Sequence, residues 1–165
     1  MNRVTQRRTV AVRVPATSAN LGPGFDTLGL ALARYDEIEV QALPAGEIDI
    51  QVTGVGEGEV PLDERHLVVR SIYTALDRLG FEHPGLRLRA HNTIPHGRGL
   101  GSSGAAIVAG VCAAAGLVSD QVTVTENQLL NIATELEGHP DNVAPCLFGG
   151  LTIAWMDAEG EPRSK

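Results

Sequence analysis

A chain of 165 residues can form one domain with a substantial hydrophobic core, or one domain and part of a second. Hydrophobic residues make up 43% of the sequence, which is ordinary for a globular protein and excludes extensive disorder. The formal net charge is −7, so the chain lacks the basic surface that nucleic-acid backbones require. We therefore expect no nucleic-acid partner.

The sequence also argues against a membrane or secreted protein. Its longest apolar stretch, 104–118, is shorter than the roughly 20 residues of a membrane-spanning helix. The basic N-terminus continues into an alternating strand pattern rather than a signal peptide. Cys112 and Cys146 lack metal-ligand spacing, and Cys112 falls in an apolar helix pattern, as small core residues do. We expect no membrane partner and a reducing, cytoplasmic setting.

The first half of the chain shows mainly the two-residue periodicity of half-buried strands. The predicted strands cover 10–14, 28–32, 38–40 and 48–52. Pro15 is expected to end the first strand, and a turn at 34–36 is expected to separate the second from the third. The glycine- and acid-rich run 54–59 is typical of a surface loop.

The second half alternates helical patterns with two strands. Predicted helices cover 68–79, 101–117, 125–137 and 140–148, and predicted strands cover 86–90 and 151–155. Gly80 and Gly138 are suitable C-terminal stops, and Thr125 and Gln128 have the spacing of a capping box. This order of elements predicts an α+β fold rather than a regular βαβ alternation. The polar tail 157–165 looks unfinished.

The glycine-rich segment 94–105, with the sequence IPHGRGLGSSGA, lies between a predicted strand and an apolar helix. Its glycines leave backbone amides uncovered, and Ser102 and Ser103 lie where the helix begins. The first turn of a helix offers free N–H groups and the positive end of its dipole, so the segment predicts a phosphate-binding loop. Ser103 is placed to bind a phosphate-associated Mg²⁺. The alternative is a tight turn whose serines merely cap the helix.

Two further clusters carry polar side chains with open interpretations. Asn20 and Asp26 either form turns by bonding their own backbone or hold a polar substrate, Asp26 favouring a cationic group. Glu135 lies at a helix C-terminus, where the dipole disfavours a carboxylate, and this suggests a role such as metal binding. Capping alone would explain Asp141, and an isolated histidine such as His139 is more often structural than catalytic.

Together the three clusters resemble the GHMP family of small-molecule kinases, which includes galactokinase, homoserine kinase, mevalonate kinase and phosphomevalonate kinase. Segment 94–105 is similar to the central ATP-binding motif of the family, whereas 15–29 and 138–150 are similar to homoserine kinases in particular. The resemblance covers 10–155. It implies a mixed sheet with packed helices, like a ribosomal-protein domain, over 1–156. A ferredoxin-like C-terminal domain would be largely absent, and 157–165 would be its start.

The resemblance implies ATP-dependent phosphorylation of the side-chain hydroxyl of L-homoserine, a step towards threonine, with the activity of so short a chain uncertain. Alternatives are a non-catalytic nucleotide-binding half-domain and a mevalonate-type kinase. An RNA-binding domain, suggested by the ribosomal fold, is disfavoured by the negative charge. Members of the family often form dimers, which makes a homodimer possible.

The resemblance also implies roles for individual residues, with ATP and Mg²⁺ as cofactors. Ser103 and Glu135 would ligate the metal, with Glu137 as the second choice for the carboxylate. Asn142 would help to orient the reacting hydroxyl, and a base role for Asp141 stays open. The implied catalytic set is Ser103, Glu135, Asp141 and Asn142, and the substrate-binding set is Asn20, Asp26, His139 and Asp141. The implied ATP-binding set is Pro95, His96, Gly97, Arg98, Gly99, Leu100, Gly101, Ser102, Ser103, Gly104 and Ala105, with His66 near adenine where many relatives have Asn.

Overall fold

The computed structural model describes residues 1–165 and confirms the predicted α+β class. Its strands are β1 (Thr9–Ala19), β2 (Leu28–Leu43), β3 (Ile48–Gly54), β4 (Gly85–Asn92), β5 (Leu151–Met156) and β6 (Pro162–Ser164). Its helices are α1 (Leu67–Leu79), α2 (Ser102–Leu117), α3 (Glu126–Glu137) and α4 (Val143–Phe148). None of them has the length and hydrophobicity that crossing a membrane requires.

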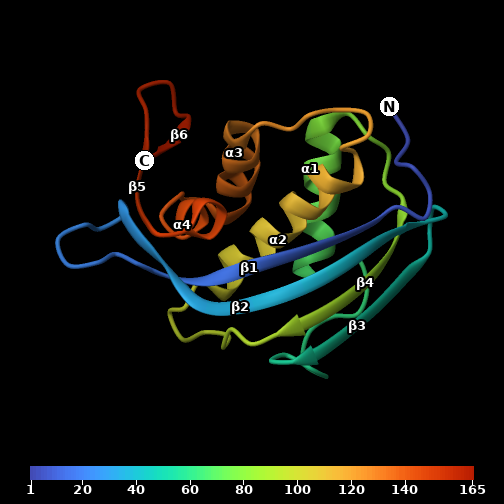
Figure 1. The fold of residues 1–165 in the computed structure, drawn as a ribbon, viewed down its shortest axis with the longest axis horizontal. Coiled ribbons are helices and arrows are strands. Elements are labelled where there is room, and N and C mark those ends of the chain that lie inside the picture. Colours follow the sequence, from blue (N-terminus) through green and yellow to red (C-terminus); the bar gives the residue numbers. More distant parts are fainter.

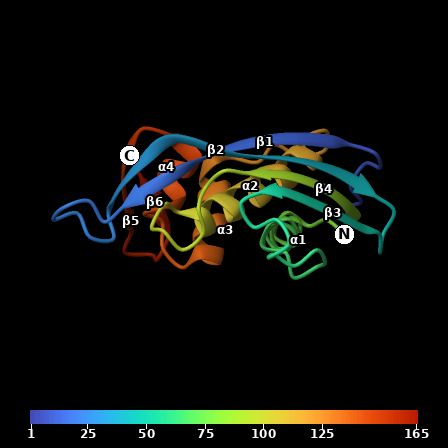
Figure 2. The same cartoon turned by 90° about the horizontal axis from the view of Figure 1, so that it is seen from below.

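The strands form one mixed sheet in the order β3–β4–β2–β5–β6, and β1 pairs with β2. Strands β3 and β4 are parallel, whereas the other pairs are antiparallel. The helices lie on one side of the sheet formed by β1 to β4, and the other side of that sheet is open (Figures 1 and 2). The alternation of side chains along each strand explains this arrangement. Val40 and Leu88 are buried under the helices, while their neighbours Glu39 and Arg87 are exposed on the open side.

Helix α2 is apolar on nearly all sides because it contacts α1, α3 and β1. Small residues allow this close packing. A Cβ atom on Gly110 would lie 2.6 Å from the Ser71 Cβ, and one on Gly116 would lie 2.6 Å from a Val10 methyl group. Cys112 lies on the same helix, half-buried against the core, and is a free thiol. These contacts hold the middle and the C-terminal end of α2 closely against α1 and β1.

The predicted helix ends are confirmed. Gly80 and Gly138 end α1 and α3 in the left-handed conformation that glycine tolerates best. Thr125 and Gln128 form the capping box at the start of α3, each side chain bonding the backbone of the other. Local sequence signals thus fix the last turn of α3, from which a candidate metal-binding carboxylate projects.

Two predicted strand boundaries are wrong. Strand β1 continues past Pro15, because β1 pairs only with β2 and the missing proline N–H is not needed there. Strand β2 is one strand rather than two. The register shifts between Pro15 and Ala16 and leaves Ala33 and Arg34 unmatched, so the turn predicted at 34–36 is a β-bulge within a continuous ladder.

The polar tail is also more ordered than its composition suggests. Residues 162–164 pair with β5 as strand β6. The connecting turn is held by Asp157, whose carboxylate accepts hydrogen bonds from the amides of Glu159 and Glu161 at 3.1 and 2.8 Å. These bonds and the Arg163 ion pair lower the pKa of Asp157. The tail therefore extends the sheet.

Candidate functional site

The glycine-rich loop presents a run of free backbone donors. Gly97, Gly99 and Gly101 all have left-handed backbones, with φ of 65°, 71° and 67°. None of the amides from 97 to 104 donates a hydrogen bond to another backbone group. Helix α2 begins directly after Gly101, and no side chain caps it, so serine capping does not explain the motif. The free amides and the positive helix end together favour an anion.

A hydroxyl and a carboxylate meet beside this loop. The Ser103 Oγ donates a hydrogen bond of 2.9 Å to the Glu137 Oε2. A Cβ atom on Gly104 would lie 3.8 Å from the other Glu137 carboxylate oxygen, so this carboxylate faces the first turn of α2. Hydroxyl and carboxylate oxygens are ligands that Mg²⁺ accepts alongside phosphate oxygens. The structure holds no group of three or more His, Cys, Asp or Glu residues arranged as a metal site.

The structure does not place Glu135 with Ser103. Glu135 forms an exposed ion pair with Arg78 of α1. Residues two apart on a helix point in nearly opposite directions, so α3 can direct only one of Glu135 and Glu137 towards α2. Only Glu137, the second choice, contacts Ser103, so it replaces Glu135 as the candidate carboxylate ligand.

The loop before α4 contains a buried carboxylate with one free oxygen. Asp141 is 1% exposed, and its Oδ1 contacts the His139 Nδ1 and accepts a 2.8 Å hydrogen bond from the Asn142 amide. Its Oδ2 is buried and has no partner. Buried polar atoms are almost always satisfied, so an orphaned carboxylate oxygen indicates a missing hydrogen-bond donor. No side chain caps α4, whose N-cap is Asn142, so capping does not explain Asp141.

Asn20 and Asp26 lie in the loop between β1 and β2, which projects from the end of the sheet (Figure 1). Both have left-handed backbones, with φ of 58° and 55°. The Asn20 Oδ1 accepts a 2.7 Å hydrogen bond from the Asp26 amide, so Asn20 serves as a turn former. The Asp26 carboxylate is exposed and remains free to bind a cation. No hydrogen bond joins this loop to Ser103 or Glu137.

A cavity of about 290 Å³ adjoins the glycine-rich loop, near the lower end of the range for small-molecule pockets. Its wall is mostly apolar, and its polar members are Asp36, Arg65, His66, Asn92, His96, Ser102 and Ser103. His66 caps α1, where its Nδ1 accepts a 3.2 Å hydrogen bond from the Val68 amide. Burial lowers the pKa of His66, which favours the neutral ring. The cavity thus has a nonpolar wall and a neutral histidine next to a phosphate-type loop.

Two residues that the sequence analysis did not single out shape this loop. The buried Asp36 carboxylate accepts hydrogen bonds from the amides of Thr93 and Ile94, at 2.6 and 2.9 Å, and so fixes the start of the loop. Thr17 donates its amide to the Leu100 carbonyl oxygen at 3.0 Å and lies against Gly101. No local sequence pattern signals either one, because their contacts join segments 57 or more positions apart.

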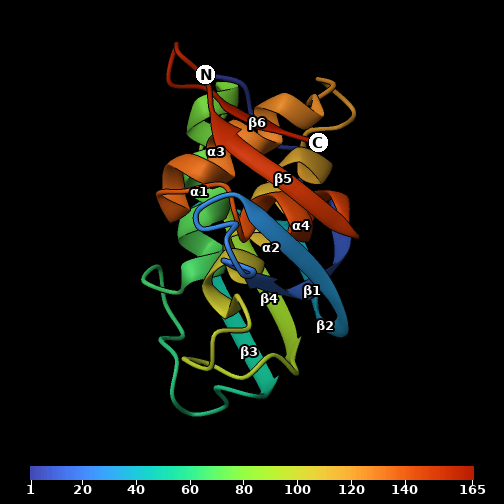
Figure 3. The ribbon, with the colours of Figure 1, turned by 90° about the vertical axis from the view of Figure 1, so that its left-hand side faces the viewer.

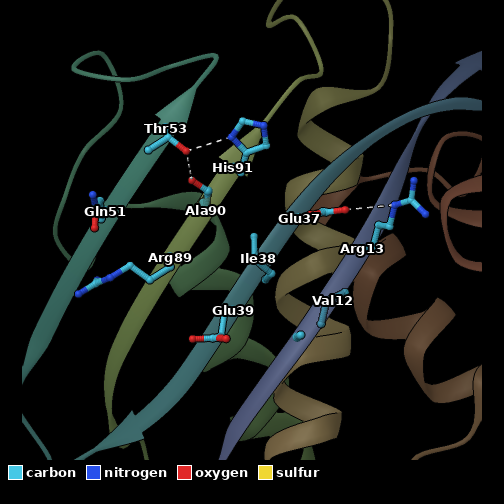
Figure 4. Close-up of a pocket in the computed structure, with 11 residues that line it drawn as sticks. Val12, Arg13, Glu37, Ile38, Glu39, Gln51, Thr53, Arg89, Ala90 and His91 are labelled. Atoms are coloured by element: carbon cyan, nitrogen blue, oxygen red, sulfur yellow. Dashed lines mark hydrogen bonds and ion pairs between the residues drawn. The ribbon is translucent and has the colours of Figure 1, made fainter.

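The largest hollow, about 570 Å³, lies on the open face of the sheet (Figure 4). Arg13 and Glu37 in its lining form an ion pair at 3.4 Å, and Arg89 pairs at 2.7 Å with Asp49, which lies outside the lining. Arg89 and Arg87 hold the pKa of Asp49 at about 2. Such cross-strand pairs are typical of a solvated sheet face. Size alone therefore does not mark the functional site.

The comparisons with known proteins identify the family of this chain. The N-terminal domain of the GHMP kinases matches residues 66–150. Among curated relatives, homoserine kinases of Leifsonia xyli subsp. xyli and Clavibacter michiganensis subsp. michiganensis are 61% and 60% identical, and the matches cover 96% of this chain. They cover 49% and 50% of those proteins, so the chain spans about half the length of the curated relatives it matches.

The solved structures lead to the same family. A homoserine kinase from Cytophaga hutchinsonii superposes with a TM-score of 0.75 at 33% identity, covering 98% of this chain and 52% of that one. A mevalonate kinase from Methanococcus jannaschii has a TM-score of 0.70 at 16% identity, covering 94% of this chain and 55% of that one, and shows the fold alone. The chain belongs to the GHMP kinase family, and it is similar to about half the length of the homoserine kinases named above.

Proposed function

We propose that this chain binds ATP with Mg²⁺ in its glycine-rich loop and acts as the N-terminal half of a kinase for the side-chain hydroxyl of L-homoserine. The observation that carries the proposal is the run of free amides at 97–104, in the loop and the first turn of α2. These amides would donate to phosphate oxygens, and the dipole of α2 would favour their charge. Arg98 is exposed and forms no ion pair within the chain, so it adds a free positive charge.

Ser103 and Glu137 are the residues that would hold the cation. Their oxygen atoms already lie within hydrogen-bonding distance, at 2.9 Å, beside the first turn of α2, where the loop ends. When bound, Mg²⁺ supplies positive charge to the phosphate oxygens during transfer. The apolar cavity beside the loop would receive the base, with His66 in its wall.

The homoserine substrate is proposed from the relatives named homoserine kinase and from the polar groups that remain free. The exposed Asp26 carboxylate is suited to an ammonium group, and the unpartnered Asp141 Oδ2 is suited to a hydrogen-bond donor. His139 lies beside Asp141 and holds that carboxylate in place. Asn20 contributes by fixing the loop that carries Asp26.

Phosphoryl transfer depends mostly on positioning and charge neutralisation, because its transition state is loose and metaphosphate-like. A dedicated base is therefore not a requirement of this site. Asn142, at the start of α4, would contribute by positioning, and Asp141 is assigned to substrate binding. Since the chain spans about half of its relatives, a half-domain that binds nucleotide without turnover is the second candidate.

Two measurements separate these candidates. Calorimetric titration with a nonhydrolysable ATP analogue, with and without Mg²⁺, should show binding that depends on the metal. No heat at millimolar nucleotide would overturn the nucleotide site. Homoserine-dependent release of ADP should occur if the chain is catalytic alone, and binding without release would identify the half-domain. The same ADP-release assay with mevalonate in place of homoserine decides between the two types of kinase.

A further inference from the structure

Thr17 connects the two loops that form the candidate site. It lies on β1, is 1% exposed, and donates its amide to the Leu100 carbonyl oxygen at 3.0 Å. Its hydroxyl lies 2.9 Å from the Asn142 Oδ1. One buried residue therefore contacts the glycine-rich loop through its backbone and the loop before α4 through its side chain.

The contact sets the direction of the Asn142 amide. A carboxamide has an oxygen that accepts and a nitrogen that donates, and either end could face a hydroxyl. The Thr17 hydroxyl has no other acceptor, and its buried proton would be unsatisfied if the nitrogen of Asn142 faced it. The oxygen of Asn142 must therefore face Thr17, and the NH₂ group must face away.

The NH₂ group of Asn142 is accessible beside α2. It forms no hydrogen bond within the chain, and it is not among the buried polar atoms that lack partners. A Cβ atom on Gly104 would lie 3.4 Å from the Asn142 Cβ, which places this side chain against the first turn of α2. A Cβ atom on Gly101 would come within 2.1 Å of the Thr17 hydroxyl, so glycine at 101 leaves room for the contact.

We propose that Thr17 is a positioning residue that holds Asn142 with its carboxamide oxygen towards Thr17 and Gly101 and its NH₂ group free beside the first turn of α2. Asn142 then donates to an acceptor oxygen, namely a phosphate oxygen of the nucleotide, and does not accept a proton from the reacting hydroxyl. The direction of the amide rests on the apo structure alone, whereas its ligand rests on the proposed nucleotide function. This assigns a role to a threonine that lies outside the predicted site.

The orientation can be tested by ¹⁵N NMR without any ligand. The side-chain NH₂ signal of Asn142 is assigned by its disappearance in Asn142→Asp. In the wild-type protein its heteronuclear NOE should approach backbone values, because the carboxamide is held. Thr17→Val has nearly the same shape but no hydroxyl, and it should lower the NOE to that of a mobile side chain. Thr17→Ser keeps the hydroxyl and should restore it.

Thr134→Val is the matched control, because Thr134 is a buried threonine whose hydroxyl has no partner. It should leave the Asn142 signal unchanged. If Thr17→Val also leaves the NOE unchanged, or if Thr17→Ser fails as Thr17→Val does, Thr17 does not position Asn142. Thermal melts identify any variant that fails to fold.

The ligand is tested with a nonhydrolysable ATP analogue and Mg²⁺. The analogue should shift the Asn142 NH₂ signal, and Thr17→Val should weaken binding about fivefold while Thr17→Ser stays close to wild type. Binding that leaves this signal unshifted would overturn the assigned ligand but not the nucleotide site. If the wild-type chain binds no nucleotide, the proposed function and the assigned ligand both fail, and the NOE still decides the orientation.

Discussion

Ser103 and Glu137 are in direct contact, with the Ser103 Oγ 2.9 Å from the Glu137 Oε2, although they lie 34 positions apart on α2 and α3. The contact brings a hydroxyl and a carboxylate to the C-terminal end of the glycine-rich loop, whose amides are free. That combination, rather than either residue alone, is what suits a metal–triphosphate ligand.

Replacing Glu137 with Gln should weaken Mg²⁺-dependent binding of a nonhydrolysable ATP analogue by about tenfold or more, because it removes a charged ligand. Glu135→Gln is the matched control, since Glu135 lies two residues away and pairs with the exposed Arg78. Calorimetry with and without Mg²⁺ measures both variants. Equal losses in the two variants would contradict the assignment of Glu137 to the metal.

Two glycines of the loop should differ in their tolerance of alanine. Gly99→Ala meets nothing within 4 Å and should cost about 1–2 kcal/mol from the left-handed backbone alone. Gly101→Ala carries the same backbone strain, and its Cβ would also come within 2.1 Å of the Thr17 hydroxyl. Its free energy of unfolding should fall by more than about 2 kcal/mol. Urea denaturation measures both, and equal losses would show that the contact with Thr17 is absent.

Stability should fall in mild acid because of His66. Burial lowers the pKa of His66 below its ordinary value of 6.5, so the unfolded chain takes up a proton before the folded one. The contribution of His66 to the free energy of unfolding is therefore complete above pH 6.5, and it declines as the pH falls towards the pKa of His66 in the folded chain. Protonation at Nδ1 would also remove the cap on Val68. The free energy of unfolding should fall between pH 7.5 and 5.5.

A pair of variants isolates this effect. His66→Asn keeps a side chain that caps helices well and removes the titrating ring, so its stability should change less over the same pH range. His91→Asn, on the open face of the sheet, is the control and should behave like the wild type. A pH dependence that persists fully in His66→Asn would contradict the role of burial at this residue.

The outer side of β5 should promote self-association. Leu151, Ile153 and Trp155 alternate along this strand and are 63%, 44% and 43% exposed, and Leu30 of β2 adjoins them as the partner of Leu151. Strand β5 runs along the outside of the molecule in Figure 3. Contiguous apolar patches on a surface mark places that another protein surface covers.

Sedimentation velocity should show a mass that rises with concentration, and Ile153→Lys should reduce this rise. Gln51→Lys introduces the same charge on the open sheet face, where the side chains are polar, and should have no effect. A wild-type chain that stays monomeric at the highest soluble concentration would show that this apolar patch does not mediate self-association.

The sequence predicts most elements of this fold because their signals are local. The apolar periods of α1 and α3, the capping box at Thr125 and the glycine stops need only neighbouring residues to specify them. Strand β2 differs, because a two-residue bulge at Ala33 and Arg34 looks like a turn until the pairing partner is known. The same limit applies to Pro15, which is tolerated because β1 lacks a second neighbour.

The candidate site also has parts that the sequence predicts and parts that only the tertiary structure reveals. The glycine-rich loop is predictable because free amides and a helix start follow from a short motif. The choice between Glu135 and Glu137 depends on how α3 is rotated against α2, which no local pattern specifies. Thr17 and Asp36 act through contacts with residues 125 and 57 positions away, so their roles follow only from the tertiary structure.

The central claim is that the amides of the glycine-rich loop bind a triphosphate, and ¹⁵N-resolved NMR of residues 97–104 tests it most directly. Adding a nonhydrolysable ATP analogue with Mg²⁺ should shift these amide signals together and slow their exchange with solvent, because each gains an acceptor. Ser119, beyond the other end of α2, should not move. If the amides of 97–104 keep their shifts and exchange rates at saturating nucleotide, the loop does not hold the phosphates.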